Sequence, residues 1–490
     1  MARKTAKPPA TDLAADQTRP RATLPQQPSD LTTAERAAKG KAARQALPRG
    51  DHATWKPPRD QRDPIGLLEA QASTRIPELL PIRYQRMLVS PFAFYRGAAA
   101  IMACDLAATP SSGLWVQLCG DAHLANFGGF ASPERALVFD INDFDETLPG
   151  PWEWDVKRLA ASCEVAGRER GLTSKQCRPI VLAAVGEYRR AMRQFSAMGT
   201  LDVWHALLDR ARIAELGDVA VSSIAAKEIK LMTAAAHTRD NVRAFEKLTR
   251  LVDGQFRIVS NPPLVVAIED LATDAERERV EKNMGRWIDT YRQSLPHDRR
   301  RLLEGYHYVH MARKVVGVGS VGMRAWIVLL FGRDDGDPLF LQIKEAQGSV
   351  LEPYLGTSAY ATSGQRVIEG QRLMQATSDI LLGWERMQGI DGQTRDFYVR
   401  QLWDWKVSAD VATMSPKALA AYGEMCAWAL ARAHARSGDR IAIAAYLGTS
   451  DTFDHAVATF AAAYADQNER DYHALAGAVK SGRVEASGNA

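Results

Sequence analysis

The stretch Leu114–Gly128, with the sequence LWVQLCGDAHLANFG, joins an apolar β-like run to a loop of polar side chains. A second apolar run, Ala136–Phe139, opens in the same way into DINDFDE. If the two strands lie side by side, both loops reach one edge of a sheet. The polar residues in these loops are Asp121, His123, Asn126, Asp140, Asn142, Asp143, Asp145 and Glu146. Crowded carboxylates repel one another unless a cation neutralises them, and oxygen ligands suit Mg²⁺ or Mn²⁺, so the pattern predicts a metal site. Turn formation, which Asp and Asn also favour, is the alternative interpretation.

A glycine-rich segment lies between two further apolar runs. Residues Lys314–Phe331 read KVVGVGSVGMRAWIVLLF, which predicts a strand, a tight turn and a second strand. The turn contains Gly317, Gly319, Ser320 and Gly322. Before a helix, this glycine spacing would indicate a dinucleotide-binding fold, whereas between strands it is typical of a flap whose backbone amides cover phosphates. A hairpin without a ligand is the alternative.

A lysine ends the next predicted strand, Pro338–Lys344. The sequence LQIK has the form of the V-A-I-K strand, whose lysine contacts nucleotide phosphates and pairs with a helix glutamate. Residues 363–386 are predicted to form the following helix, and Glu369 on it is the favoured partner of Lys344. Glu345 and Glu352 are the competing candidates. The flap and the lysine together predict a nucleotide site, with ATP as the ligand.

The charge of the chain is unevenly distributed. Residues 1–60 carry 12 Lys/Arg against 6 Asp/Glu and contain eight prolines, which predicts a disordered basic tail. The rest of the 490-residue chain is close to neutral, which argues against an extended nucleic-acid-binding face and leaves only weak binding through the tail. Five cysteines without CxxC spacing predict free thiols rather than a disulfide framework or a zinc site. With no apolar run long enough to span a membrane and no signal peptide, we expect a cytoplasmic protein.

The loop Cys119–Asn126, the catalytic-type loop, is similar to the catalytic loop of aminoglycoside-phosphotransferase-like kinases, which has the form H-G-D-x-H-x-x-N. Cys119–Asn126 reads CGDAHLAN, so Cys119 replaces the leading histidine. The resemblance implies that Asp121 positions the acceptor hydroxyl and that Asn126 binds the metal. The second metal-binding aspartate is either Asp140, which has the better spacing, or Asp143, which begins the D-F-G-like sequence DFD.

The order of these motifs is reversed relative to ordinary kinases, in which the glycine flap and lysine precede the catalytic loop. A circular permutation explains the reversal and is physically allowed when the original termini lie close together. The helix predicted at Lys417–Ser437, which contains LARAHARSG, would then be the helix that normally leads into the catalytic loop.

Over roughly residues 60–475 the sequence also closely resembles the bacterial DUF2252 family. The resemblance is carried by the stretches SPFAFYRG, GDAHLANFG, FDINDFDETLPGPWEWDVKRLAAS, KVVGVGSVG, LQIKEA and FAAAYADQNERDY. That family has been grouped with kinase-like folds, but its name supplies no reaction.

These observations predict an α+β fold, namely a two-lobed, circularly permuted kinase-like fold with large helical additions. Its expected segments are a basic tail (1–60), a helical lobe with the catalytic and metal-binding loops (61–305), a β-rich nucleotide lobe (306–410), C-terminal helices completing the first lobe (411–480) and a disordered end (481–490).

Three further residues have two interpretations each. Asp155 either caps its helix or braces the catalytic loop. Arg96 either reaches a phosphate or forms a structural salt bridge. His123, which we count with Asp121 among the catalytic candidates, either braces the loop or binds the metal.

Together these motifs predict an ATP- and Mg²⁺-dependent phosphotransferase that acts on an unknown small-molecule or protein acceptor. We expect the acceptor to be bound by the helices of residues 160–300. A nucleotide-binding pseudokinase, a nucleotidyl-transferring relative and a metal-dependent hydrolase are the alternatives.

Overall fold

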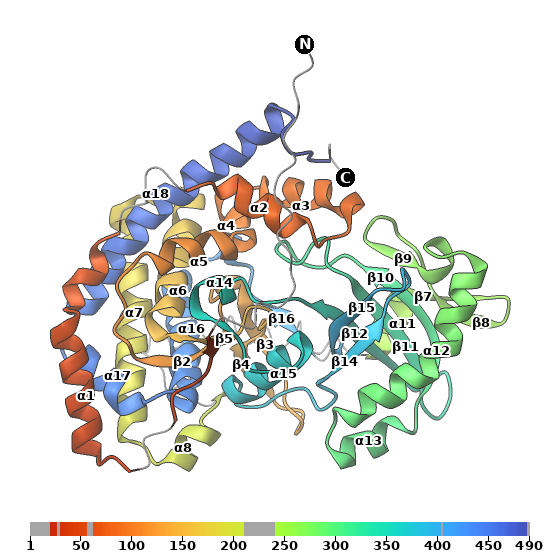
Figure 1. Ribbon diagram of the computed structural model, residues 1–490, viewed down its shortest axis with the longest axis horizontal. Helices are drawn as coiled ribbons and strands as arrows, with labels where there is room; N and C mark the ends of the chain where they lie inside the picture. Colours follow the sequence, from red (N-terminus) through yellow and green to blue (C-terminus); the bar gives the residue numbers. More distant parts are fainter. Residues whose placement is uncertain (1–19, 27–29, 56–61, 210–240, 403–404, 488–490) are drawn as a thin grey trace.

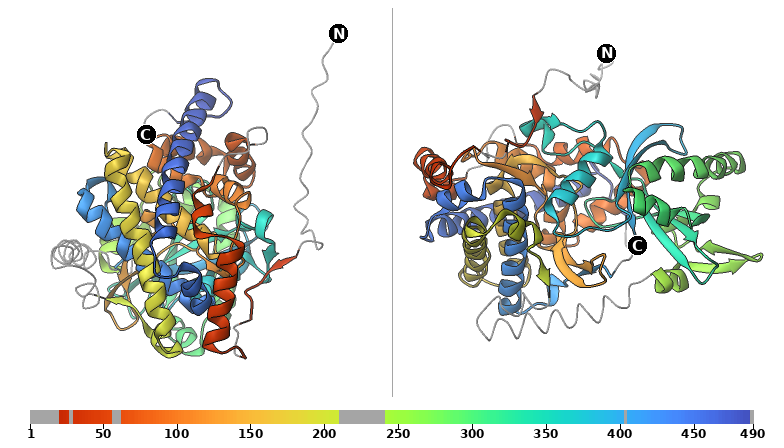
Figure 2. Two further views of the ribbon diagram at one scale, coloured as in Figure 1. Left: turned by 90° about the vertical axis from the view of Figure 1, so that its left-hand side faces the viewer. Right: turned by 90° about the horizontal axis from the view of Figure 1, so that it is seen from below.

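The computed structural model describes residues 20–26, 30–55, 62–209, 241–402 and 405–487. Within these ranges the chain forms an α+β fold with a helical lobe and a lobe built on an antiparallel sheet. Figure 1 shows the helical lobe on the left and the sheet lobe on the right, and the right-hand view of Figure 2 shows the same division from below. None of the described helices is long and apolar enough to cross a membrane.

The sheet lobe contains a six-stranded antiparallel sheet in the order β14-β15-β12-β11-β10-β9. Its strands are β9 (Val265–Ala267), β10 (His307–Lys314), β11 (Ala325–Phe331), β12 (Pro338–Ala346), β14 (Gly383–Gln388) and β15 (Thr394–Gln401). The predicted run of strand, glycine turn and two strands is confirmed as β10, β11 and β12. In this register Lys344 on β12 stands between Ala325 of β11 and Tyr398 of β15.

The helix predicted at residues 363–386 is too long. Helix α15 (Ser363–Met374) ends where Gln375 adopts an extended conformation, and β14 begins at Gly383. The apolar residues Leu381 and Leu382, which suggested helical continuity, are buried between these two elements. A short apolar run shows neither the helical nor the strand period, so the sequence could not tell a continued helix from a helix that ends before a strand.

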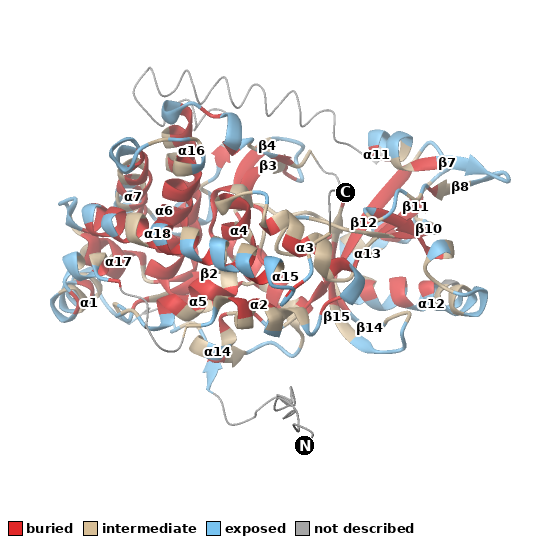
Figure 3. Ribbon diagram, turned by 90° about the horizontal axis from the view of Figure 1, so that it is seen from above, coloured by how far each residue is buried: buried red, intermediate tan, exposed pale blue. Residues whose placement is uncertain are grey.

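The sheet lobe also begins earlier in the chain than residue 306. Helices α11 (Asn241–Leu248), α12 (Asp274–Gln293) and α13 (His297–Leu303) precede the sheet, and α12 packs on it through a core shared with β10, β11 and β15. Figure 3 shows α11, α12 and α13 beside the strands. The boundary predicted at 305/306 therefore divides the sheet lobe itself, because amphipathic helices give no sign of which lobe they cover.

The helical lobe is built on long buried helices. Trp152 on α6 stacks on Tyr188 of α7 with ring centroids 5.6 Å apart, and α16 packs along α7. The C-terminal α18 crosses both α6 and α7. Burial along α6 and α16 is nearly continuous (Figure 3). The long helices of this lobe are α6 (Trp152–Glu169), α7 (Ser174–Ala197), α16 (Pro416–Ser437) and α18 (Thr452–Lys480).

The strands that lead into the two acidic loops do not pair with each other as predicted. Strand β2 (Trp115–Leu118) pairs with β5 (Leu148–Pro151), while β4 (Leu137–Ile141) pairs with β3 (Phe127–Ala131). The loops still meet, because β3 follows the first loop directly and pairs with the strand that precedes the second. The backbone amide of Asn142 accordingly donates to the carbonyl of Asn126 at 2.8 Å.

The end of α16 lies against the start of β2, although the two are far apart in the sequence. The Ser437 hydroxyl accepts a hydrogen bond from the Gln117 amide at 3.1 Å. At Gly438 a Cβ atom would come within 2.9 Å of the Trp115 carbonyl oxygen, so only glycine allows this approach.

The predicted disorder of residues 1–60 is wrong for residues 30–55. Helix α1 (Thr33–Ala46) opens with a capping box between Thr32 and Glu35 and packs on α17 (Arg440–Leu447). The Arg36 guanidinium pairs with Asp439 at 2.8 Å. Alanine-rich helices need little aromatic surface when they pack closely on another helix, so the composition of this segment misled the prediction. Residues 1–19, 27–29 and 56–61 lie outside the described ranges.

The predicted disorder of residues 481–490 falls partly on described residues. Val484 is buried beside Ile65 and Leu475, so the chain is ordered up to this point. Residues 488–490 lie outside the described ranges. The five cysteines are free, as predicted.

Candidate functional site

Asp155 holds the loop that follows β2. One carboxylate oxygen accepts a hydrogen bond from the Cys119 amide at 2.8 Å, and the other accepts from the Gly120 amide at 3.1 Å. His434, from the segment LARAHARSG of α16, lies 3.2 Å from the same carboxylate. These contacts agree with the interpretation that Asp155 braces the loop, and not with the interpretation that it caps its own helix. His434 reaches this bracing carboxylate from another part of the chain, whereas Cys119 occupies the place of the expected histidine.

Asp121 is the acidic side chain of this loop and lies half-buried against Arg158. Its Oδ1 accepts from Arg158 Nε at 2.8 Å and from Nη2 at 2.7 Å. Burial raises the pKa of Asp121 to about 6, and Arg158 opposes that rise. His123 Nε2 lies 3.6 Å from the second carboxylate oxygen, and burial lowers the pKa of His123 well below its usual range. A neutral His123 therefore faces Asp121, and its buried Nδ1 has no hydrogen-bond partner.

The two candidate metal-binding aspartates lie in different surroundings. Asp140 is buried, and Arg432 Nη2 donates to both of its oxygens at 2.6 and 2.5 Å. Asp143, three residues further on, lines a cavity together with Asp121 and Asn126. Asn126 donates its Nδ2 to the Asp121 carbonyl at 2.9 Å, which leaves its side-chain oxygen available to a ligand. The structure thus ties Asp140 to the core and leaves Asp143 at the cavity.

Lys344 pairs with Asp145 and not with Glu369. The Nζ–Oδ2 distance is 2.8 Å, and Tyr398 donates its hydroxyl to the other oxygen of Asp145 at 2.6 Å. Burial opposes the charge on Lys344, but Asp145 and Tyr398 raise its pKa above the usual value. Glu369 pairs with Arg372 at 3.2 Å, while the competitors Glu345 and Glu352 lie near Arg324 and Arg366 respectively. The partner of Lys344, Asp145, belongs to the second acidic loop. The prediction looked for a glutamate on the helix that follows Lys344 in the sequence and therefore missed it.

The glycine-rich loop closes over the same cavity. Gly317 and Gly322 have φ values of +68° and +88°, a conformation that glycine adopts without strain. The Arg75 guanidinium donates to the Gly319 carbonyl at 2.7 Å, and Arg86 donates to the Gly317 carbonyl at 2.6 Å. The loop is therefore fixed from outside by arginines that the sequence analysis did not single out.

One cavity of about 110 Å³ brings most of the predicted site residues together. The sequence-predicted residues along its wall are Arg96, Asp121, His123, Asn126, Asp143, Gly317, Gly319 and Ser320. Arg75, Arg83, Asp145 and Glu146 line it as well, whereas Asp140, Lys344 and Glu369 do not. The space admits a few water-sized groups, which is room for one small oxyanion rather than a whole nucleotide.

Oxygen atoms dominate the acidic side of this cavity. Asn126 and Asp143 are the hard oxygen ligands that Mg²⁺ prefers when substrate phosphates and water complete its shell. Among the described residues, no group of three or more His, Cys, Asp and Glu side chains is placed to hold a metal ion by itself. The donor set therefore fits a cation bound jointly with phosphate and does not fit a metal centre made by protein alone.

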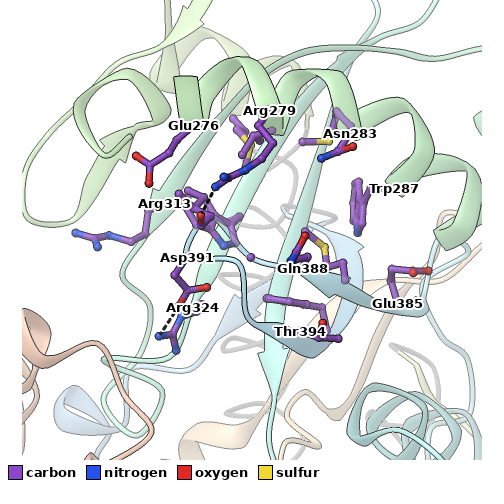
Figure 4. A pocket seen from close by; sticks show the side chains of 18 of the residues that line it. Glu276, Arg279, Asn283, Trp287, Arg313, Arg324, Glu385, Gln388, Asp391 and Thr394 are labelled. Carbon is purple, nitrogen blue, oxygen red and sulfur yellow. Dashed lines mark hydrogen bonds and ion pairs between the residues drawn. The ribbon is translucent and has the colours of Figure 1, made fainter. Parts of the chain in front are cut away.

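A larger cavity of about 820 Å³ lies between α12 and the strands of the sheet. Figure 4 shows side chains of α12 and of the β14–β15 hairpin facing each other across it. Trp287, Met311 and Trp326 form apolar parts of its wall, and Glu385 lies at one end. None of the sequence-predicted site residues lines this cavity, whereas most of them line the smaller one.

We expect Glu385 to make the stability of the protein dependent on pH. Burial raises its pKa from 4.5 to about 7. Its contribution to stability is fully present below pH 4.5 and is lost as the pH rises through about 7, because ionisation is disfavoured in the folded state. Glu385→Gln should therefore gain stability over the wild type between about pH 5 and about pH 8, measured as a difference in Tm. Glu304→Gln, at an exposed position, serves as the control, and a Tm difference for Glu385→Gln that does not change with pH would contradict the assignment.

The fold and the small cavity define a class: α+β proteins in which a glycine-rich loop covers an acidic, asparagine-containing loop. The family described as "Uncharacterized protein conserved in bacteria (DUF2252)" matches residues 75–478, and the chain belongs to this family. Comparison with curated proteins and with solved structures yields no match.

Proposed function

We propose that the protein is an ATP- and Mg²⁺-dependent phosphotransferase of the protein-kinase-like type. The observation that carries the proposal is the shared cavity, in which Gly317–Ser320 of the glycine-rich loop faces Asp121, Asn126 and Asp143. These groups come from two distant parts of the chain. Kinases combine the same parts, namely a glycine-rich flap, an aspartate that accepts the acceptor proton, and an Asn and an Asp for magnesium.

The order of the elements supports a circularly permuted kinase-like arrangement. The glycine-rich loop joins β10 and β11, Lys344 lies on the next strand of the meander, and α15 follows. This is the placement that protein kinases use for the flap and the phosphate-binding lysine. The contact of Ser437 with Gln117 marks the place where an unpermuted chain would run from α16 into β2.

In the proposed reaction the acceptor hydroxyl oxygen attacks the γ-phosphorus of ATP. A new O–P bond forms, the bond from phosphorus to the β,γ-bridging oxygen breaks, and ADP leaves with that electron pair. Asp121 receives the hydroxyl proton, and Arg158 keeps the carboxylate oriented towards the cavity. Lys344, held by Asp145, orients the phosphates, and the amides of the glycine-rich loop cover them. Asn126 and Asp143 would hold Mg²⁺, which supplies charge neutralisation on the phosphates.

A nucleotide-binding protein without transfer activity is the second candidate. It is favoured by the ion pair between Asp121 and Arg158, which lowers the basicity that a proton acceptor needs. A nucleotidyl transferase would use the same cavity with the nucleotide bound in the reverse direction. The hydrolase alternative is weaker, since the acidic cluster does not form a protein-only metal site in the described residues.

A thermal-shift series tests the nucleotide site. MgATP at 100 times its Kd should stabilise the full chain by about 2.7 kcal/mol, and Mg²⁺ alone should have no comparable effect. Lys344→Met should weaken MgATP binding by about tenfold to a hundredfold, since a charge-assisted phosphate contact is lost. Lys417→Met, an exposed lysine at the start of α16, is the matched control. Equal MgATP affinity in Lys344→Met and the wild type would reject the proposed role of Lys344, and mass spectrometry of the products then separates phosphoryl transfer, nucleotidyl transfer and binding alone.

A further inference from the structure

Three arginines from the N-terminal helices line the side of the cavity that the catalytic-type loop does not form. Arg75 follows α2 (Pro64–Ala72), Arg83 lies on α3 (Leu80–Met87), and Arg96 lies on α4 (Pro91–Gly97). The exposed fraction is 9% for Arg75 and 0% for Arg83. Arg75 and Arg83 are buried and Arg96 is half-buried, and none of the three belongs to the glycine-rich loop or to the Lys344–Asp145 pair.

The hydrogen bonds found for two of these guanidinium groups go to neutral acceptors. Arg83 donates to the Leu68 carbonyl at 3.5 Å and to the Gln71 side-chain oxygen at 3.0 Å. Arg75 donates to carbonyls of the glycine-rich loop. The Nε atoms of all three arginines are buried without a hydrogen-bond partner. In the described part of the chain, no carboxylate lies within ion-pair distance of any of the three.

Burial lowers the pKa of Arg75 and of Arg96, and the nearby carboxylates of Glu146 and of Asp121 and Asp143 oppose this shift only in part, without an ion pair to either arginine. Asp121 is paired with Arg158, Asp145 is paired with Lys344, and Glu146 accepts from the Val350 amide at 2.7 Å. Buried charges are rare unless they are paired, and an unpaired one costs several kcal/mol. Burial, together with the nearby charge of Arg75, lowers the pKa of Arg83 to about 9. An anionic ligand would remove this cost.

We propose that Arg75, Arg83 and Arg96 bind an anionic group of the acceptor, a phosphate or a carboxylate, in the cavity beside Asp121. This inference rests on the proposed phosphotransferase function and names the class of its acceptor, a hydroxyl compound that carries a negative charge. The nucleotide phosphates are expected under the amides of the glycine-rich loop and near Lys344, whereas Arg83 and Arg96 come from α3 and α4 and line the same cavity beside that loop.

Calorimetric titration of the full chain with inorganic phosphate tests the anion site. Phosphate should bind the wild type in the absence of nucleotide and also in the presence of MgADP. Arg96→Gln should weaken phosphate binding by about tenfold or more, since a charge-assisted hydrogen bond is lost. Arg301→Gln, at an exposed arginine of α13, should leave phosphate binding unchanged. Arg75→Lys, which keeps the positive charge, is a second and milder variant in case Arg96→Gln does not fold.

Three outcomes would overturn the proposal: no phosphate binding at millimolar concentration, equal binding by Arg96→Gln and the wild type, or displacement of phosphate by MgADP. The last outcome would assign the arginines to the nucleotide. MgATP binding by the same samples keeps the two proposals distinguishable. MgATP binding without phosphate binding overturns only the anion site, whereas phosphate binding without MgATP binding overturns the phosphotransferase and its acceptor.

Turnover with a panel of acceptors tests the ligand class directly. Hydroxyl compounds with a phosphate group, hydroxy acids and their neutral counterparts would be incubated with MgATP and followed by ³¹P NMR. Phosphorylated products should form from one of the two anionic classes of compound, the hydroxyl compounds with a phosphate group or the hydroxy acids. Products formed only from neutral compounds would overturn the proposal. Whether the phosphate-bearing compounds or the hydroxy acids give a phosphorylated product shows which anionic group the acceptor carries.

Discussion

Replacing Asp121 by asparagine is expected to lower phosphoryl transfer by about 10²–10⁴-fold, the range that a positioned proton acceptor contributes. Asparagine fills the same space, and its side-chain oxygen can still accept from Arg158 Nε, which lies 2.8 Å from the carboxylate. The fold should therefore survive. The amide cannot take the proton of the acceptor hydroxyl, so the transfer step is lost while the glycine-rich loop and Lys344 still bind the nucleotide.

ADP release in the presence of an acceptor, followed alongside MgATP thermal shifts, measures the two effects separately. The expected result for Asp121→Asn is an unchanged MgATP shift with little ADP release. His123→Gln is an informative companion, because His123 faces Asp121 but is neutral. Full turnover by Asp121→Asn would remove Asp121 from the mechanism. Inactivity of the wild type with every acceptor, despite MgATP binding, would favour the nucleotide-binding protein without transfer activity.

Asp140→Asn is expected to lower the free energy of unfolding by about 3–5 kcal/mol, the usual cost of removing one partner of a buried ion pair. The Arg432 guanidinium is buried, and its Nε and Nη1 atoms have no hydrogen-bond partner. Among the described residues, Asp140 is the only ion-pair partner of Arg432, and it also accepts a hydrogen bond from the Ala376 amide at 3.0 Å. The substitution would leave a buried positive charge where β4 meets α16.

Asp143→Asn is the matched control at the other candidate position. Asp143 lines the cavity, and the hydrogen bond it accepts from the Asp145 amide at 3.2 Å can be kept by asparagine. Urea denaturation should therefore show little loss of stability, whereas the Mg²⁺-dependent part of nucleotide binding should fall. The opposite pattern, with a stable Asp140→Asn that loses Mg²⁺ dependence, would make Asp140 the metal ligand.

Much of the local structure was predictable because strands and tight turns leave short-range signals. The apolar runs before Cys119 and Asp140 are the strands β2 and β4, and the glycine-rich turn lies between β10 and β11 as predicted. The helix carrying Glu369 was also predicted, although it ends twelve residues early. Predictions that depended on which strand pairs with which were less successful. The pairing of β2 with β5 depends on contacts that no local pattern contains.

The amino-acid sequence was sufficient to nominate the groups of the candidate site: an aspartate and an asparagine in one loop, acidic residues in a second, glycines in a turn and a lysine on the next strand. Periodicity and spacing report on neighbours along the chain, which is why these local motifs could be read directly. The identity of each charged partner became visible only in the folded molecule. Lys344 pairs with Asp145 instead of Glu369. Asp140 pairs with Arg432 and does not line the cavity. Ion pairs form between groups that share a buried space, and the packing of distant segments creates that space.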